Sequence, residues 1–501
     1  MTAKAKKKAR ATIDLNSPEH FINRELSLLE FNRRVLAQAR VKSTPLLERL
    51  FFLCIASSNL DEFFEIRVAG LKQQVAFGSV QGGPDNMSPS EQLQKISAVA
   101  HEIVEEQYKV LNEEVISGLK KEDIHCLNLN NWNQKQQKWI KGYFNRELLP
   151  ILSPVGLDPA HPFPQVLNKS LNFIISLEGK DAFGRNSGIA IVQAPRALPR
   201  LVQLPQSCST HAYDFVFLSS IIHNHADDLF PGMKVTGCYQ FRITRNSDLL
   251  VSEEEVGDLM RALEGKLPSR RFAEPVRLEV HNNCPQEMID YLTHHFNLQQ
   301  NDVYQVNGPV NLNRLMEISQ KVKRPDLKYP AFTPGVQNRL LKSRDIFKSI
   351  KKGDILLHHP YQSFNTVVDF VRQAAMDPNV LAIKQTLYRT EDDSSIVDAL
   401  IKAAQEGKEV TVVIELRARF DEEENIELAN ELQSAGAHVS YGVVGHKTHA
   451  KMSLAIRREG RLLKRYVHLG TGNYHAGTAR QYTDYSFLTS DHSITDDVQK
   501  V

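Results

Sequence analysis

This sequence has little of several features that would narrow its function at once. Its formal net charge is only +2 over 501 residues, so any anion site must come from local clustering of basic residues. Its five cysteines are scattered and form no Cys-x-x-Cys pair, which argues against a disulfide framework and fits a reducing compartment. No apolar run approaches the roughly 20 residues of a membrane-spanning helix. No ladder of aromatic and basic residues indicates a single-strand nucleic-acid binder, and we expect no nucleic-acid partner.

The composition is that of a globular protein, with 42% hydrophobic and 24% charged residues. The length exceeds one ordinary core, so we predict a multidomain α/β protein. Residues 1–16 should be a basic disordered tail. They should be followed by a helical N-terminal domain over 17–120, an α+β middle domain over 121–335 and an α/β domain over 336–501.

The evidence for these domains is a change of pattern along the chain. Leucine stripes at helical spacing mark the first domain, where Ser88 and Glu91 form a capping box. In the last domain, apolar runs at 381–387 and 409–416 alternate with helical patterns at 364–376, 396–406 and 423–435. Alternation of strand and helix at this spacing predicts parallel pairing.

The most informative segment is His449-Ala450-Lys451, followed by Gly470-Thr471-Gly472-Asn473. Alternating apolar residues predict a strand over 448–456 with His449 and Lys451 on one face. Imidazole is a nucleophile, and an ammonium beside it would hold an anion during attack on a phosphoryl group. The loop adds backbone N–H groups and the Asn473 side chain as donors. The simpler interpretation is a polar strand face followed by an ordinary turn.

His-x-Lys followed by Gly-Thr-Gly-Asn resembles half of a phospholipase D-type active site, although the aspartate usual seven residues after the histidine is Ile456 here. The whole chain is similar to the long-form polyphosphate kinases. The matching stretches are 23–27, 31–35, 58–63, 158–164, 245–248, 358–361, 382–389, 415–422 and 478–485. The resemblance implies a phospholipase D-like fold for residues 336–501.

The resemblance also implies an activity: reversible transfer of the ATP terminal phosphoryl group to inorganic polyphosphate through a phosphohistidine. His449 would be the phosphorylated residue, assisted by Lys451 and Asn473. ATP would be the substrate and Mg²⁺ the cofactor. Arg389 and Arg419 match the residues around nucleotide-bound magnesium. A guanidinium has no lone pair for a metal, so these arginines would surround the ion through phosphate or water.

Two further residues, Asn59 and Tyr482, have two interpretations each. Asn59 with Glu62 has the spacing of a helix capping box, whereas the resemblance implies a contact with the nucleotide base. Tyr482 could be a buried tyrosine, whereas the resemblance implies contact with ATP. Asp484 would share a face with Tyr482 in an extended segment. The Asp484 carboxylate could orient His449 and so take the place of the missing superfamily aspartate. Likewise, Arg389 and Arg419 could simply pair with acidic residues 421–424.

Two rival functions remain at this point. One is a phospholipase D-like phosphodiesterase or nuclease, against which Ile456 counts. The other is a non-catalytic polyphosphate-binding protein. Because only one His-x-Lys set is present, we also expect a C-terminally truncated chain that lacks a second catalytic domain. We expect a homo-oligomer in the cytoplasm, with at most peripheral membrane association.

Overall fold

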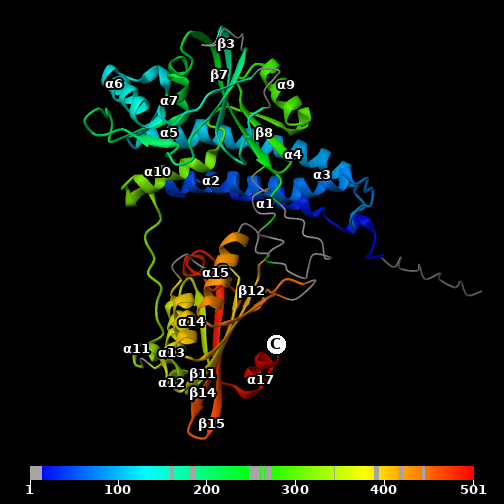
Figure 1. Cartoon of the computed structure of the whole chain (residues 1–501), viewed down its shortest axis with the longest axis vertical. Coiled ribbons are helices and arrows are strands. Elements are labelled where there is room, and N and C mark those ends of the chain that lie inside the picture. The colour runs from blue at the N-terminus through cyan, green and yellow to red at the C-terminus, as the bar shows by residue number, and fades with distance from the viewer. Residues whose placement is uncertain are drawn as a thin grey trace, which may run out of the picture. The chain divides into compact units, whose positions relative to one another are not determined.

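The computed structural model describes residues 14–157, 163–180, 188–247, 260, 265, 272–343, 345–388, 394–416, 421–442 and 446–501. These residues form two compact units (Figure 1). Unit 1 comprises residues 14–247 and 272–330, and unit 2 comprises residues 331–501 with residues 260 and 265. Most of the predicted basic tail, residues 1–13, lies outside the described residues.

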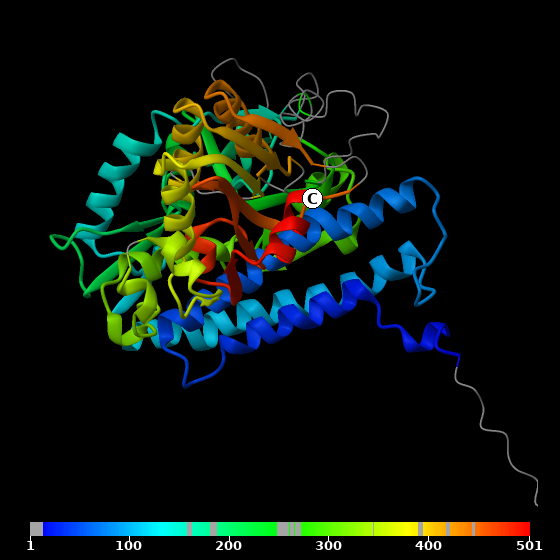
Figure 2. The same cartoon turned by 90° about the horizontal axis from the view of Figure 1, so that it is seen from below.

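The first part of unit 1 is helical, with long helices lying side by side (Figure 2). Asn23 caps the first helix by accepting hydrogen bonds from the backbone of Glu25 and Leu26. The predicted capping box of Ser88 and Glu91 is confirmed at the start of the fourth. The helices are α1 (Arg24–Gln38), α2 (Leu46–Glu62), α3 (Ala69–Ala76), α4 (Pro89–Lys109) and α5 (Ile116–Lys121), with π-helical segments at Phe63–Val68 and Val110–Val115.

Asn59 lies inside α2 and not at the start of a helix, so the capping-box interpretation of Asn59 and Glu62 is wrong. The helix begins at Leu46, more than three turns earlier, and buries Leu50, Leu53 and Leu60 along one continuous face. Asn59 is half-buried, and its amide donates a hydrogen bond of 3.3 Å to Asn32 Oδ1. It is therefore a side-chain donor on the helix surface.

The second part of unit 1 contains two sheets. The three-stranded sheet has the order β1-β6-β5, and the six-stranded sheet has the order β2-β4-β3-β7-β8-β9. The strands are β1 (Ile124–Leu127), β2 (Val155–Leu157), β3 (Asn172–Gly179), β4 (Ile189–Gln193), β5 (Leu201–Gln203), β6 (Tyr213–Phe217), β7 (Met233–Arg245), β8 (Pro275–His281) and β9 (Val303–Val306). The helices are α6 (Gln134–Tyr143), α7 (Leu218–Asn224), α9 (Gln286–His295) and α10 (Met316–Lys321).

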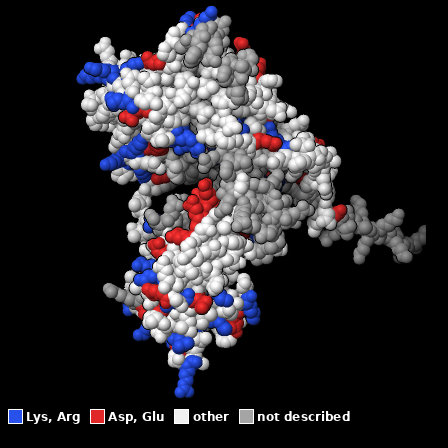
Figure 3. Space-filling model, viewed as in Figure 1, with Lys and Arg blue, Asp and Glu red and all other residues white. Residues whose placement is uncertain are grey.

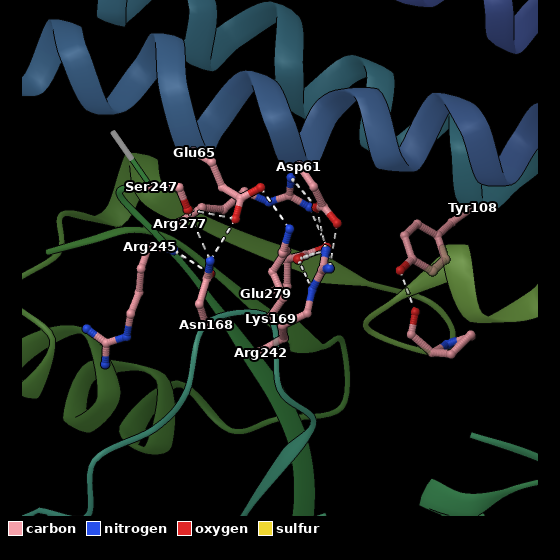
Figure 4. A network of polar contacts seen from close by, with 11 residues as sticks. Asp61, Glu65, Tyr108, Asn168, Lys169, Arg242, Arg245, Ser247, Arg277 and Glu279 are labelled. Atoms are coloured by element: carbon pink, nitrogen blue, oxygen red, sulfur yellow. Dashed lines mark hydrogen bonds and ion pairs between the residues drawn. The ribbon is translucent and has the colours of Figure 1, made fainter. Parts of the chain in front are cut away.

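A buried ionic network joins α2 to the six-stranded sheet (Figure 4). Arg242 of β7 donates to both carboxylate oxygens of Asp61, at 2.8 Å each, and pairs with Glu279 of β8. Arg277 pairs with the same Glu279. Because removal of one partner would leave a buried charge uncompensated, at a cost of about 3–5 kcal/mol, this network fixes α2 on the sheet.

Unit 2 is built on one seven-stranded mixed sheet of order β10-β16-β15-β14-β11-β12-β13. Helices α13, α14 and α15 cover one face, and α17 lies on the other (Figures 1 and 2). The strands are β10 (Ile355–His359), β11 (Val380–Leu387), β12 (Glu409–Ile414), β13 (His438–Tyr441), β14 (Lys451–Glu459), β15 (Leu462–Gly470) and β16 (Asp484–Thr489). The helices are α11 (Asn338–Leu341), α12 (Ile346–Lys351), α13 (Asn365–Met376), α14 (Ser395–Gln405), α15 (Glu422–Ser434), α16 (Ala476–Ala479) and α17 (His492–Lys500).

Candidate active site at one edge of the unit 2 sheet

The strand directions bring several predicted residues to one edge of the unit 2 sheet. β11 pairs in parallel with β12 and antiparallel with β14, and β15 is antiparallel to both β14 and β16. The carboxyl ends of β11, β12 and β15 therefore lie at the same edge as the amino ends of β14 and β16. Ligands commonly bind at the carboxyl edge of such sheets. His449, Asn473 and Asp484 all belong to segments at this edge.

His449 and Lys451 are neighbours at this edge, but His449 precedes the strand. β14 begins at Lys451, so the prediction that His449 lies within the strand is wrong. His449 is exposed, and its ring meets Tyr388 edge to face with centroids 5.8 Å apart. The Lys451 ammonium lies 5.3 Å from the centroid of the same Tyr388 ring. Tyr388 thus contacts both side chains.

Lys451 is only 6% exposed. Its Nζ donates a hydrogen bond of 2.7 Å to the carbonyl oxygen of His449. Burial lowers the pKa of Lys451, and the negative charge of Asp484 opposes this shift. An ammonium carries three N–H bonds, so the bond to His449 leaves two for the oxygens of an anion.

Two side chains hold the backbone on either side of His449. Glu415, buried after β12, accepts a hydrogen bond of 2.6 Å from the Thr448 N–H. Thr386 of β11 accepts one of 3.0 Å from the Met452 N–H. Sequence reasoning assigned no role to Glu415 or Thr386. The sequence signal for Glu415 was a carboxylate directly after a buried strand.

The loop after β15 is fastened to the start of β16. Thr471 Oγ1 donates a hydrogen bond of 2.8 Å to Asp484 Oδ1 and accepts one of 2.9 Å from the Tyr485 N–H. A Cβ atom on Gly472 would lie 2.4 Å from Asp484 Oδ2, so only glycine allows this approach. Gly472 therefore permits close packing of the loop against the Asp484 carboxylate.

A row of buried polar side chains crosses the three central strands beneath this edge. Gln385 pairs with Ser453, and Ser453 pairs with His468, so the three side chains share one face. Within the described ranges, Gln385 Oε1, Ser453 Oγ, His468 Nε2 and Asn473 Oδ1 are buried without a hydrogen-bond partner. Because buried polar atoms are normally paired, this row indicates a site that a ligand or water completes.

Two buried histidines, His468 and His359, lie in this region. The His468 Nδ1 atom lies 2.7 Å from the Tyr474 hydroxyl, and burial lowers the pKa of His468 to about 3. The His359 Nε2 atom lies 2.9 Å from Ser486 Oγ, and burial lowers the pKa of His359 as well. Both rings are therefore neutral hydrogen-bonding groups near neutral pH.

The structure leaves some predicted site residues apart from this cluster. Arg389 and Arg419 lie outside the described residues. Tyr482 is 63% exposed and follows α16, so the prediction of an extended segment through Tyr482 and Asp484 is wrong. Between His449 and Asp484 no hydrogen bond is present in the described ranges, and the orienting role of Asp484 stays a prediction. Asn59 belongs to unit 1.

The described residues of this edge do not form a metal site by themselves. In the described part of the chain, the one group of three or more potential metal-binding side chains is elsewhere, at Asp123, His125 and His211. A magnesium ion at this edge would therefore need phosphate oxygens and water as ligands, which is common for this ion. Figure 3 shows acidic side chains gathered over α15, where Glu423, Glu424 and Glu427 are exposed, so that helix face is unsuited to an anion.

Comparisons with known proteins match most of this chain. Residues 21–127 match the polyphosphate kinase N-terminal domain, residues 135–318 the middle domain and residues 345–501 the C-terminal domain 1. The chain is 57% identical over 481 residues to a polyphosphate kinase of Pseudomonas aeruginosa, a match that covers 96% of this chain and 70% of that protein. It is 55% identical over 475 residues to a polyphosphate kinase of Neisseria gonorrhoeae, covering 95% of this chain and 69% of that protein.

A solved structure is also similar. The crystal structure of polyphosphate kinase from Porphyromonas gingivalis superposes with a TM-score of 0.79 at 28% identity, covering 96% of this chain and 68% of that chain. The fractions of the chains that these matches cover do not by themselves support the expected C-terminal truncation, which stays a prediction. The predicted multidomain fold and the predicted class of enzyme, a kinase, are confirmed. On these matches the chain belongs to the polyphosphate kinase family of phosphotransferases.

Proposed function

We propose that His449 is the nucleophile in reversible transfer of the ATP terminal phosphoryl group to inorganic polyphosphate. The observation that carries this proposal is the arrangement around His449. The exposed His449 ring lies beside Tyr388, the Lys451 ammonium donates a hydrogen bond to the carbonyl oxygen of His449, and the Gly470–Asn473 loop follows the adjacent strand.

The proposed reaction has two steps. In the first, a ring nitrogen of His449 attacks the γ-phosphorus, the new N–P bond forms, and the bond to the bridging oxygen breaks. ADP leaves with that electron pair. In the second step, a terminal oxygen of polyphosphate attacks the phosphohistidine, and the N–P bond breaks to restore the imidazole. Phosphoryl transfer of this kind requires positioning and compensation of charge.

The other residues supply that positioning and charge. Lys451 directs its two remaining N–H bonds to phosphoryl oxygens, and the nearby Asp484 carboxylate favours the charged form of Lys451. Asn473 and the loop N–H groups add donors. From the family resemblance, Arg389 and Arg419 contact the phosphates, and Asn59 and Tyr482 contact the nucleotide. Magnesium bound with the nucleotide would neutralise phosphate charge.

The proposal includes a cytoplasmic location, which the scattered cysteines favour, and self-association as a homo-oligomer. None of the helices in the described ranges combines the length and the apolar character that crossing a bilayer requires.

Incubation with γ-labelled ATP and polyphosphate tests the proposed function. We expect acid-labile, base-stable label on the protein and label in the polymer. Hydrolysis of a phosphodiester without ATP would instead indicate a phosphodiesterase or nuclease. Stoichiometric binding of polyphosphate without any transferred label would indicate a non-catalytic binding protein.

A further inference from the structure

A second cluster of chemistry-bearing side chains lies in unit 1, at the start of two paired strands. β1 and β6 run in parallel, with Ile124 opposite Tyr213 and His125 opposite Asp214. This register brings the segment before β1, with Asp123, beside the turn before β6, with His211. One donor atom each of Asp123, His125 and His211 lies within 4.8 Å of the other two.

The backbone holds Asp123 in place for this contact. Asp123 has a left-handed backbone with φ of 59°, a conformation that aspartate tolerates better than most residues. Its Oδ2 accepts a hydrogen bond of 2.9 Å from the Ala212 N–H, and its carbonyl oxygen accepts one of 3.2 Å from the Tyr213 N–H. The remaining carboxylate oxygen, Oδ1, lies 3.8 Å from His125 Nε2.

His211 is held by a buried carboxylate. Its Nδ1 lies 2.7 Å from Oδ1 of Asp214, whose side chain is fully buried. The other oxygen of Asp214 accepts hydrogen bonds from the Thr210 N–H and from the Gln136 amide. A carboxylate on one ring nitrogen leaves the other, Nε2, as the available ligand atom, and metal-binding histidines in proteins are typically oriented in this way.

His125 completes the cluster, and within the described part of the chain its ring makes a stacking contact in place of a hydrogen bond. Its ring stacks on His211 with centroids 3.5 Å apart and an interplanar angle of 11°. The 3.8 Å separation from Asp123 exceeds hydrogen-bond length, and no hydrogen bond to the His125 ring is present among the residues that the structure describes. No hydrogen bond from these residues therefore opposes rotation of the ring out of the stack.

We propose that Asp123, His125 and His211 bind one divalent transition-metal ion of the Zn²⁺ class. Two imidazoles and one carboxylate are the donor set that such ions prefer, whereas Mg²⁺ and Ca²⁺ prefer oxygen ligands alone. Tetrahedral zinc places neighbouring donor atoms about 3.4 Å apart, close to the 3.8 Å between Asp123 and His125. Because the two rings are nearly parallel in the structure, metal binding requires the His125 ring to turn out of the stack so that its lone pair points toward the ion, and water supplies the fourth ligand.

The ion would link β1, which follows helix α5, to β6. The Asp123 side chain is 57% exposed and both histidines are half-buried, so the ion enters from solvent. Bound metal would stabilise the folded state because the unfolded chain does not bring the three ligands together. Its three ligands belong to unit 1, whereas His449 and Lys451, proposed for phosphoryl transfer, belong to unit 2.

Competition with a chromophoric zinc chelator tests the proposal on the whole chain, with Mg²⁺ in excess. We expect one equivalent of Zn²⁺ in the wild type and in His449→Ala, and a higher melting temperature with zinc. His125→Gln and His211→Gln should each weaken zinc binding about 100-fold or more, and Asp214→Asn about 10- to 100-fold. His294→Gln, which changes an exposed histidine of the same unit, is the matched control and should bind zinc normally.

A second measurement does not depend on how the variants fold. In the wild type, zinc should slow deuterium exchange at the C2–H of His125 and His211 and leave His294 unchanged. Absence of zinc binding by the wild type would overturn the proposal. Equal affinity in the wild type and both ligand variants, or unchanged exchange at the two histidines, would do so too.

Discussion

The Lys451 ammonium donates a hydrogen bond of 2.7 Å to the carbonyl oxygen of His449. A charged side chain that is 6% exposed is expensive to desolvate, and one carbonyl oxygen compensates only part of that cost. This combination is typical of a residue kept for its charge at a functional site. It leads to a prediction in which stability does not fall with activity.

The first prediction concerns Lys451→Met. Loss of the ammonium should slow phosphorylation of the protein by ATP about 10²- to 10³-fold, the range for removal of one preorganised donor. The melting temperature should stay unchanged or rise, because a buried charge is removed. Rapid-quench labelling and thermal unfolding measure the two effects. A fall in both rate and melting temperature would show that Lys451 is structural.

The lowered pKa of Lys451 gives a prediction for the pH dependence. The ammonium loses its proton at a lower pH than an ordinary lysine with a pKa of 10.5. The phosphorylation rate should therefore decline on the alkaline side below pH 10.5, and Lys451→Arg, which keeps its charge, should abolish that decline. Identical alkaline profiles for the wild type and Lys451→Arg would assign the decline to another group.

Gly472→Ala tests the packing of the loop against Asp484. The new Cβ atom would lie 2.4 Å from Asp484 Oδ2, so the loop and the Thr471–Asp484 hydrogen bond must shift. We expect unit 2 to lose about 1–3 kcal/mol of stability, together with much of its phosphorylation activity. Gly70→Ala, with no atom within 4 Å of the new Cβ, is the control.

A double variant separates this clash from other effects of the Gly472 change. Asp484→Ala removes the clashing oxygen, so Gly472→Ala should cost less stability in that background than in the wild type. Strictly additive unfolding free energies would contradict the close approach seen in the structure.

His468 predicts a pH dependence of stability. Burial lowers its pKa to about 3 in the folded state, from an ordinary value of 6.5. Between these values the unfolded chain binds a proton that the folded chain does not, so the stabilisation is complete above pH 6.5 and is lost as pH falls toward 3. Relative to His468→Gln, the wild type should lose about 1.4 kcal/mol per pH unit between pH 6 and 5. Urea unfolding at these pH values measures it, and parallel stability curves would contradict it.

Arg389 and Arg419 give a prediction from sequence alone. An arginine that binds phosphate through both ends of its guanidinium fork cannot be replaced by lysine without loss. Each Arg→Lys change should therefore reduce activity about tenfold or more, equivalent to roughly 1.4 kcal/mol. Unchanged steady-state kinetics in both variants would make them ordinary surface residues.

Several strands and helices of both units were predictable because their patterns are local. In unit 2, apolar runs at 381–387 and 409–416 correspond to β11 and β12, and in unit 1 the capping box at Ser88 opens α4. The prediction of a helix start at Asn59 was wrong because the spacing of Asn59 to Glu62 fits a capping box, whereas the continuous apolar face of α2 shows that the helix begins earlier. Local spacing alone does not decide between these two patterns.

The parts of the site that could not be predicted depend on long-range pairing. The row of Gln385, Ser453 and His468 requires the register of three strands. β14 begins only at Lys451, and just before it the Thr448 N–H is bonded to the Glu415 side chain. Tyr482 lies outside β16 because the short helix α16 ends just before Tyr482. His475 caps α16, and histidine is a residue type that rarely indicates a helix start.

The most direct test of the central claim is to locate the phosphoryl group on the protein. After a brief reaction with γ-labelled ATP and digestion at alkaline pH, mass spectrometry should place the phosphohistidine at His449. His449→Ala should carry no label and keep the wild-type melting temperature, whereas the exposed His446→Ala should be labelled normally. Label on another residue of the wild type, or label retained in His449→Ala, would contradict the account.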